Sequence, residues 1–336
     1  MGPVAGQQGD VGPEPPEASP GVTPNVPEAV DTLETRDGFV ERHEESRLAD
    51  AGGRPDTEAG AAGVGANHGW HRIMAIANQK GGVGKTTTAV NLGAALAELG
   101  HRVLVVDLDP QANATTGLGV EARNLDYSTY DVIMRETPLE DCIEPSSVRN
   151  LFVCPSTIDL AGAEIELVPT FSRELRLRRA LEAVVDQFQY VLIDCPPSLG
   201  LITINGLAAA REVLVPIQCE YYALEGLGQL LRNVQLVRSH LNAGLEVTAI
   251  LLTMYDARTR LSDQVAEEVR SHFGGRVCRN VIPRTVRLSE APSFGQPITV
   301  FDPLSRGAVA YRELAKEVSA HAPQRFGQGP GGADPE

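Results

Sequence analysis

The 336-residue sequence predicts a doubly wound α/β domain, in which a mostly parallel sheet has helices on both faces. Three observations predict this fold. Short, wholly apolar runs recur along the chain, as expected of strands that are covered on both sides. Helical patterns lie between these runs, and such alternation builds parallel sheets. A glycine-rich loop follows the first apolar run, and ligands of such sheets bind at the carboxyl ends of the strands.

The predicted elements follow one another along residues 71–320 without an internal repeat. Strands are expected at the apolar runs 73–77, 102–107, 151–154, 190–194, 212–217, 247–254 and 277–282. Helices are expected where apolar residues recur every three or four positions, at 86–99, 172–186, 224–241, 260–273 and 304–320.

The two ends of the chain differ in composition from this core. Residues 1–70 hold 13 acidic and 4 basic side chains and are rich in Pro, Gly and Ala. Such a segment cannot bury enough apolar surface to offset its ordering entropy. We therefore expect 1–70 and the tail 321–336 to be disordered and 71–320 to form one domain. The net charge of −15 argues against indiscriminate binding of polyanions, although local patches matter more than the total.

Two features predict a cytoplasmic protein with no membrane partner. There is no 18-residue apolar run and no basic-then-apolar signal at the N-terminus. The cysteines are odd in number, and no close pair suggests a metal or redox site. We expect reduced and mostly buried thiols. The five are Cys142, Cys154, Cys195, Cys219 and Cys278.

The glycine-rich loop carries two of only three lysines in a chain with 26 arginines. Such a bias keeps lysine where a compact point charge is needed. A strand, a glycine loop and a helix start together form an anion site, because backbone N–H groups and the helix dipole face the ligand. Lys85 is expected to reach the β/γ-phosphates of a nucleotide and the Thr86 hydroxyl to bind Mg²⁺. The predicted phosphate-binding residues are Lys80, Gly81, Gly82, Val83, Gly84, Lys85, Thr86 and Thr87.

Three aspartates stand where predicted strands end, at Asp107, Asp109 and Asp194. An aspartate after an apolar strand can hold Mg²⁺ through its water shell, and Asp194 fits that position. The alternative is that these aspartates cap the turns that follow them. No Ser-His-Asp or Cys-His pattern competes, so the chemistry expected here is positioning and charge neutralisation.

The loop departs from the general phosphate-binding pattern, because Gln79 stands where a glycine is usual and Lys80 is added. This resembles the deviant Walker A loop of P-loop NTPases. Residues 73–318 as a whole resemble the ParA/Soj chromosome-partitioning ATPases of the MinD/ParA superfamily. The segments that carry this resemblance are 107–113, 160–168, 193–200, 218–226 and 281–293.

The resemblance implies an ATPase that is weak alone and stimulated by a partner. Its cofactors would be ATP and Mg²⁺, and two subunits would sandwich two nucleotides. Lys80 would reach the phosphates bound by the partner subunit, and Asp109 would position or activate the attacking water. Asp107 would support the magnesium shell, and Pro283 and Arg284 would border the adenine.

The resemblance also implies that the ATP-bound homodimer binds DNA without sequence preference. A centromere-bound ParB partner would then stimulate hydrolysis and release the dimer from the nucleoid. Seven arginines against three acids between residues 258 and 287 give a physical basis for phosphate contacts. In the family, the residues matching Arg258 and Arg287 carry DNA binding.

Some alternatives remain open at this stage. The acidic, Pro-rich residues 1–70 depart from the family, and they do not fit the operator-reading helix-turn-helix of larger plasmid relatives. A MinD-like protein would need a C-terminal amphipathic helix with bulky apolar residues, whereas residues 311–320 have few. An iron–sulfur carrier would need matched interface cysteines. An ATPase that positions another cargo shares the same machinery.

Overall fold

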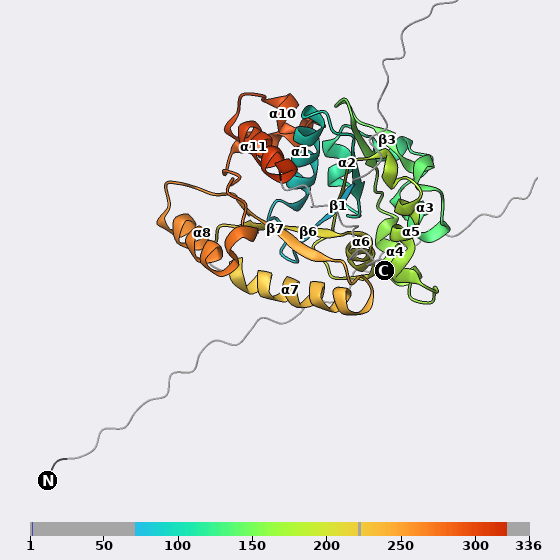
Figure 1. Cartoon of the computed structure of the whole chain (residues 1–336), viewed down its shortest axis with the longest axis horizontal. Helices are drawn as coiled ribbons and strands as arrows, with labels where there is room; N and C mark the ends of the chain where they lie inside the picture. The colour runs from blue at the N-terminus through green and yellow to red at the C-terminus, as the bar shows by residue number, and fades with distance from the viewer. Residues whose placement is uncertain (1, 3–70, 221–222, 321–336) are drawn as a thin grey trace, which may run out of the picture. The chain divides into compact units, whose positions relative to one another are not determined.

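The computed structural model describes residues 2, 71–220 and 223–320; the predictions made for 1–70 and 321–336 lie outside them. Within the described residues, seven strands form one sheet in the order β3-β4-β2-β5-β1-β6-β7 (Figure 1). All neighbours pair in parallel except β3 and β4, so the predicted α/β class is confirmed. The strands are β1 (Arg72–Ile76), β2 (Val103–Asp107), β3 (Glu144–Pro145), β4 (Leu151–Cys154), β5 (Tyr190–Asp194), β6 (Glu212–Gln218) and β7 (Glu246–Thr253).

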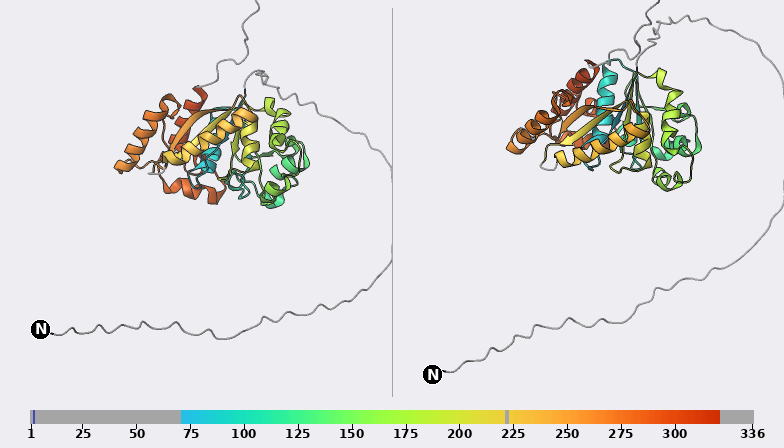
Figure 2. Two further views of the ribbon diagram at one scale, coloured as in Figure 1. Left: turned by 90° about the horizontal axis from the view of Figure 1, so that it is seen from below. Right: turned by 60° about the horizontal axis from the view of Figure 1, so that its bottom comes forward.

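Helices cover both faces of the sheet, and the two further views in Figure 2 show this layering. One core cluster packs α1, α2 and α11 against one face of the sheet. A second cluster packs the helices from α3 through α8 against the opposite face. The helices of the first group are α1 (Lys85–Glu98), α2 (Asn113–Gly117), α9 (Val286–Glu290), α10 (Ile298–Phe301) and α11 (Arg306–Ala320). Those of the second are α3 (Thr129–Arg135), α4 (Leu160–Glu166), α5 (Arg176–Glu182), α6 (Leu201–Ala209), α7 (Ala223–His240) and α8 (Arg260–Phe273).

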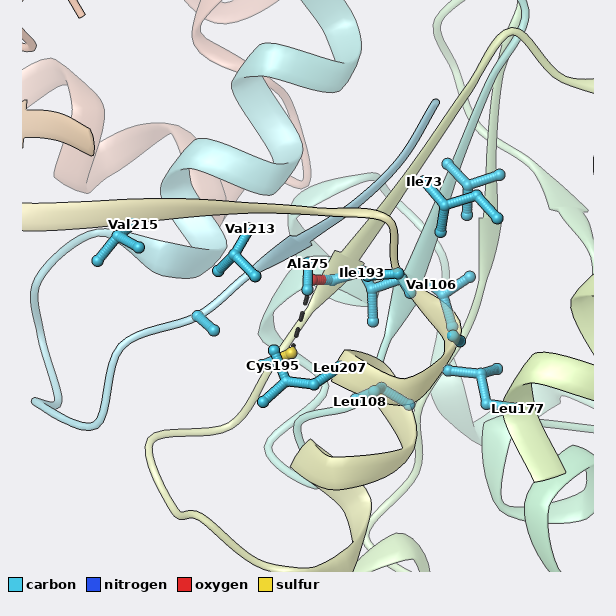
Figure 3. Close-up of a cluster of buried hydrophobic side chains, with 14 of the residues drawn as sticks. Ile73, Ala75, Val106, Leu108, Leu177, Ile193, Cys195, Leu207, Val213 and Val215 are labelled. Atoms are coloured by element: carbon cyan, nitrogen blue, oxygen red, sulfur yellow. Dashed lines mark hydrogen bonds between the residues drawn. The ribbon is translucent and has the colours of Figure 1, made fainter. Parts of the chain in front are cut away.

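The core under the second face is built from side chains that alternate along the strands. Figure 3 shows Ala75, Val106 and Ile193 from the strands meeting Leu207 of α6. Each of these is buried, and β-branched residues suit a sheet that is covered on both sides. The Cys195 thiol lies in the same cluster and donates a weak hydrogen bond to the Ile193 carbonyl. All five cysteines are buried and free, as predicted.

The last predicted strand, 277–282, does not form. The segment makes no continuous ladder with β7 in the described residues: the isolated bridges are Ile250 with Val277 and, just beyond both, Tyr255 with Pro283. The amides of Cys278 and Ile282 donate to the carbonyls of Ile250 and Leu252 at 2.9 and 2.8 Å. The amides of Arg279 and Asn280 instead donate to the Glu317 carboxylate of α11, at 2.7 and 3.1 Å. Because those donors are taken by a side chain, they cannot continue a ladder along β7.

The helix predicted over 172–186 is interrupted. A 3₁₀ turn at Arg173–Leu175 precedes α5, and a second one at Val185–Gln187 follows it. Ser172 has a left-handed φ of 50°, and Asn205 of α6 takes over two backbone groups at this point. Its side chain accepts from the Leu177 amide at 3.2 Å and donates to the Arg173 carbonyl at 2.8 Å. A tertiary contact therefore overrides the local helical pattern.

The order of the strands brings the predicted site together. In the sheet register, Asp194 at the end of β5 pairs with Ile76 of β1 on one side and with Asp107 of β2 on the other. The carboxyl ends of three central strands therefore lie at one edge, directly beside the loop that joins β1 to α1.

Candidate functional site

The loop between β1 and α1 has the backbone of an anion cradle. Gly82 and Gly84 adopt left-handed φ values of 72° and 89°, which favour glycine because it lacks a Cβ. Gly84 is the N-cap of α1, and no side chain of the described residues caps this helix. The first turn of α1 contains no acidic residue. The first amides of α1 are thus left for a negatively charged ligand.

Lys85 lies at the start of α1 and is almost completely buried. Its ammonium donates to the carbonyl of Lys80 in its own loop, at 3.1 Å. Burial lowers the pKa of Lys85, while the nearby Asp194 carboxylate acts in the opposite direction. The lysine is therefore held inside the cradle, and its contact with phosphates stays a prediction.

Asp194 is a buried carboxylate that forms no ion pair of normal geometry with any of the described residues. Neither oxygen has a hydrogen bond of normal geometry to any of the described residues, and the side chain is wholly buried. Burial raises its pKa well above the usual range, and Asp107 adds to this. Thr86 and Lys85 favour the charged form without offsetting the burial. Such an arrangement costs free energy until a cation is supplied.

A magnesium ion fits this chemistry. The hydroxyl of Thr86 lies close enough to the Asp194 carboxylate to favour its charged form. The two predicted oxygen ligands therefore lie together at the cradle. Mg²⁺ is usually held by one or two protein oxygens and by substrate phosphates. Across residues 71–220 and 223–320, no group of three or more His, Cys, Asp or Glu side chains could hold a metal by itself. A metal here would therefore depend on the nucleotide for most of its ligands.

Asp107 and Asp109 differ in what their carboxylates contact. Both oxygens of Asp107 accept hydrogen bonds, from the Asp109 amide at 3.0 Å and from the amide and hydroxyl of Thr115 at 2.9 and 2.7 Å. Burial raises the pKa of Asp107 to about 6. Asp109 is only half-buried, and one of its oxygens accepts from the Gln111 amide at 3.0 Å. Asp109 is thus the freer of the two, whereas the assignment of Asp107 to the magnesium shell remains a prediction.

Lys80 is the more exposed of the two lysines in the loop. Its side chain is 40% exposed, and its ammonium pairs with Glu220 at 3.3 Å. Its amide donates to Asn78, whose own side-chain amide bonds the Pro216 carbonyl of β6 at 2.7 Å. The backbone of this lysine is therefore anchored to the sheet while its charged end stays accessible.

The predicted adenine-side residues lie beyond the end of β7. The Thr253 hydroxyl donates to the Val83 carbonyl at 2.8 Å, so the end of β7 touches the phosphate loop. Two residues further on, Tyr255 forms a bridge with Pro283 and accepts from the Arg284 amide at 3.0 Å. The structure thus brings Pro283 and Arg284 to the strand end that contacts the cradle.

The two predicted DNA-binding arginines are exposed, and both have acidic partners. Arg258 is 89% exposed and binds both oxygens of Asp256, at 2.9 and 2.7 Å. Arg287 is 58% exposed and pairs with Glu290 at 3.1 Å and with Asp302 at 3.3 Å. The sequence count between residues 258 and 287 omitted these three acids, so the local positive charge is smaller than predicted.

Sequence reasoning missed several residues that shape the site. Asn78, Thr115, Glu220 and Thr253 each contact a predicted site residue or its loop through hydrogen bonds or an ion pair. Thr115 and Asn78 lie close in sequence to predicted residues. A polar side chain that near the end of an apolar strand could have been used to predict both as site residues. Glu220 and Thr253 lie 140 and 170 residues from their partners, and no local pattern announces such contacts.

The MinD-like alternative needs a C-terminal helix with a free apolar face, and α11 is the helix at that position. Its apolar residues, among them Tyr311 and Leu314, are buried against α1, and the Tyr311 hydroxyl is 3.3 Å from that of Thr88. This apolar face is therefore already covered. None of the helices in the described residues is long and apolar enough to cross a membrane.

Comparisons with known proteins agree with this geometry. A family model described as an AAA domain matches residues 71–247. The sporulation initiation inhibitor protein Soj of Bacillus subtilis is 60% identical over 250 residues, covering 74% of this chain and 99% of Soj. The chromosome partitioning protein ParA of Myxococcus xanthus is 50% identical over 258 residues, covering 76% of this chain and 91% of that protein. A solved structure named cobyrinic acid a,c-diamide synthase, from Mycobacterium smegmatis with bound ADP and magnesium, is 41% identical with a TM-score of 0.66, covering 75% of this chain and 95% of the other. The chain belongs to the ParA/Soj family of chromosome-partitioning ATPases.

Proposed function

We propose that this chain binds and hydrolyses ATP with Mg²⁺ and uses the nucleotide to control its grip on DNA during chromosome or plasmid partitioning. The observation that carries the proposal is the buried Asp194 carboxylate beside Thr86, at the uncapped start of α1. A negatively charged ligand that brings its own cation satisfies both features at once. The bound ADP and magnesium of the Mycobacterium smegmatis protein support this choice.

Each predicted residue has a part in the proposed reaction. The amides of the loop from Gly81 to Thr87 receive the phosphates, and Lys85 neutralises charge on the transferred group. Mg²⁺, held by Thr86 and Asp194, supplies further neutralisation when it is bound. Asp109 orients the attacking water, because its carboxylate is accessible and its backbone is fixed by Asp107. Pro283 and Arg284 border the base.

The active form in this proposal is a homodimer with two nucleotides between its subunits. The exposure of the Lys80 ammonium, together with its anchored backbone, supports a role outside its own cradle. Reaching phosphates bound by the partner subunit would replace Glu220 with a stronger, more deeply buried acceptor. A dimer also doubles the DNA contacts of Arg258 and Arg287, which makes DNA binding dependent on ATP.

A ParB-type centromere-binding protein is the proposed stimulator of hydrolysis, and the nucleoid is the proposed location. Both follow from family membership together with the basic segment around Arg258. The names of relatives called chromosome partitioning protein ParA and chromosome-partitioning ATPase Soj support a role in partitioning rather than in another cargo system.

The deciding experiment is a DNA-binding titration with ATP, with ADP and without nucleotide, each with and without the candidate ParB. Tight binding only with ATP, reversed when ParB is added, is expected. Equal binding in all nucleotide states would reject the proposed switch. Light scattering on the same samples should show a dimer with ATP and a monomer with ADP.

Asp109→Ala tests the hydrolytic step. We expect turnover to fall by about 100-fold or more, the scale of losing a positioned general base. Nucleotide affinity should stay within a few-fold of the wild type, so that the ATP-bound dimer stays on DNA. Normal turnover in this variant would remove Asp109 from the proposed role.

A further inference from the structure

Asp107 is a hub of hydrogen bonds rather than an open carboxylate. Its Oδ1 accepts from the Asp109 amide, and its Oδ2 accepts from both the amide and the hydroxyl of Thr115. Since Asp107 is the last residue of β2, these bonds tie the sheet to the loop that carries Asp109. The orientation of Asp109 therefore depends on how firmly the Asp107 side chain is itself held.

The residue that holds Asp107 is Thr115 of α2. The N-cap of this helix is Ala112, which has no side chain that can cap, and the third helical amide is that of Thr115. Asp107, at the end of β2, accepts a hydrogen bond from that amide and so caps the helix in place of the Ala112 side chain. The Thr115 hydroxyl adds a second, shorter bond to the same oxygen.

Thr115 is fixed from its other side as well. It is wholly buried, and its hydroxyl oxygen accepts from the Ser156 amide at 3.0 Å, just beyond the end of β4. The hydroxyl therefore has one acceptor and one donor, which sets the direction of its proton. A chain of hydrogen bonds runs from Ser156 through Thr115 and Asp107 to the Asp109 amide.

We propose that Thr115 is a positioning residue for hydrolysis: its hydroxyl fixes the Asp107 carboxylate, and through it the backbone of Asp109. This inference rests on the proposed role of Asp109 in orienting water. Small misplacements of a positioning group cost turnover rather than binding. Thr115 therefore acts on the rate of the chemical step and leaves the phosphate cradle around Lys85 unchanged.

Three variants separate the hydroxyl from the shape of the side chain. Thr115→Val removes the hydroxyl and nearly keeps the volume, whereas Thr115→Ser keeps the hydroxyl and loses the methyl group. Thr116→Val is the matched control, because it makes the same chemical change one residue away at an exposed position. Turnover and KM for ATP, the dissociation constant for a fluorescent ATP analogue and thermal unfolding are measured for each full-length chain.

For Thr115→Val we expect kcat to fall about tenfold, the scale of losing a hydrogen bond to a charged group, with KM and the dissociation constant within twofold of the wild type. Thr115→Ser should recover most of the rate, and Thr116→Val should match the wild type. Hydrogen exchange in the nucleotide-free protein gives a second readout. The Asp109 amide should exchange faster in Thr115→Val than in Thr115→Ser or Thr116→Val.

An unchanged kcat in Thr115→Val would overturn the inference, as would an equal loss in Thr115→Ser and Thr115→Val. A parallel loss of ATP affinity would assign Thr115 to general stability of the site instead. If Thr115→Val does not fold, Thr115→Ala against Thr115→Ser provides the same contrast. The outcome is separable from the proposed function. Normal turnover in Asp109→Ala would reject the proposed function. Reduced turnover in Asp109→Ala together with normal turnover in Thr115→Val would reject only the inference about Thr115.

Discussion

The nucleotide edge of the sheet handles charge in the opposite way to the exposed side chains of Arg258 and Arg287, which we call the arginine surface. At the nucleotide edge, Asp194 is buried with no hydrogen bond of normal geometry to the described residues, and Lys85 donates only to its own loop. On the arginine surface, Arg258 and Arg287 are exposed, and each is already paired with carboxylates. The first region holds a buried carboxylate whose charge a ligand with a cation would neutralise. The charges of the second region are already paired without a ligand.

The two regions should therefore respond to ligands on different energy scales. A buried, unmatched charge costs several kcal/mol unless it is neutralised, so a nucleotide with its cation gains much at the first region. Exposed ion pairs are worth about 0–1 kcal/mol each, so DNA phosphates can displace Asp256 or Glu290 at little cost. Binding at the second region should also be much more sensitive to salt.

The largest effect is expected at the nucleotide edge, in Lys85→Ala. Removing one partner of a desolvated charge pair costs about 2–5 kcal/mol, so ATP affinity should fall by about 30-fold or more. Titration with a fluorescent ATP analogue measures it. Lys316→Ala, which removes the lysine that pairs with Glu313 on α11, is the control and should bind ATP normally. Retained affinity in Lys85→Ala would reject the assignment of the cradle.

Gly81→Val should separate ATP binding from dimerisation. No heavy atom of the described chain lies within 4 Å of a Cβ placed at Gly81, and its φ is not left-handed, so the single subunit should accept the side chain. A facing subunit would meet it, so we expect ATP binding close to the wild type but no dimer in light scattering. Gly275→Val, at a position that is equally open, should dimerise normally. A normal dimer in Gly81→Val would contradict the proposed sandwich.

Charge reversal on the arginine surface should have an intermediate effect. Arg258→Glu and Arg287→Glu should each lower DNA affinity about tenfold or more, and neutral replacements should reduce the slope of log affinity against log salt by about 1 per lost phosphate contact. ATP-dependent dimerisation should persist. The exposed Arg149, which lies far along the chain before β4, gives the control Arg149→Glu. Unchanged DNA affinity in both variants would place the DNA surface elsewhere.

The smallest change is expected in stability, with Asp194→Asn in the absence of nucleotide. Because folding raises the pKa of Asp194, the native state binds its proton more tightly than the unfolded state does. The wild type should therefore lose stability as pH rises from the ordinary carboxyl range through the raised pKa. The variant should lack this loss and be about 1–3 kcal/mol more stable at neutral pH.

Urea unfolding at pH 5 and pH 8 measures this difference. Magnesium and ATP should stabilise the wild type more than Asp194→Asn, because the variant cannot offer a charged oxygen to the cation. Equal stability of the two proteins at both pH values would mean that Asp194 is compensated within the protein.

The nucleotide edge could be predicted from sequence because its residues lie in short, contiguous segments. The loop from Lys80 to Thr87 follows an apolar strand, Asp107 and Asp194 end two others, and parallel strands bring their ends to one edge. The contact between Thr253 and Val83 could not be found in this way. It joins residues 170 positions apart, which come together because β1 pairs with β6 and β6 pairs with β7.

The misjudged elements share a physical cause. In the strand expected over 277–282, the amides of Arg279 and Asn280 are taken by Glu317, and the helix expected over 172–186 is interrupted by Asn205. In both cases a polar side chain from a distant element took backbone groups that the local pattern had assigned to regular structure. The acidic partners of Arg258 and Arg287 were missed because the count of charges stopped at the ends of the segment.

The hydrogen bond from Thr253 to the Val83 carbonyl joins the phosphate loop to the end of β7, a few residues before Arg258, one of the two arginines proposed to contact DNA. Arg258 follows Thr253 by five residues, which span at most about 18 Å even when fully extended. We therefore expect a change in the phosphate loop on nucleotide binding to reach Arg258 through the end of β7, within a single domain.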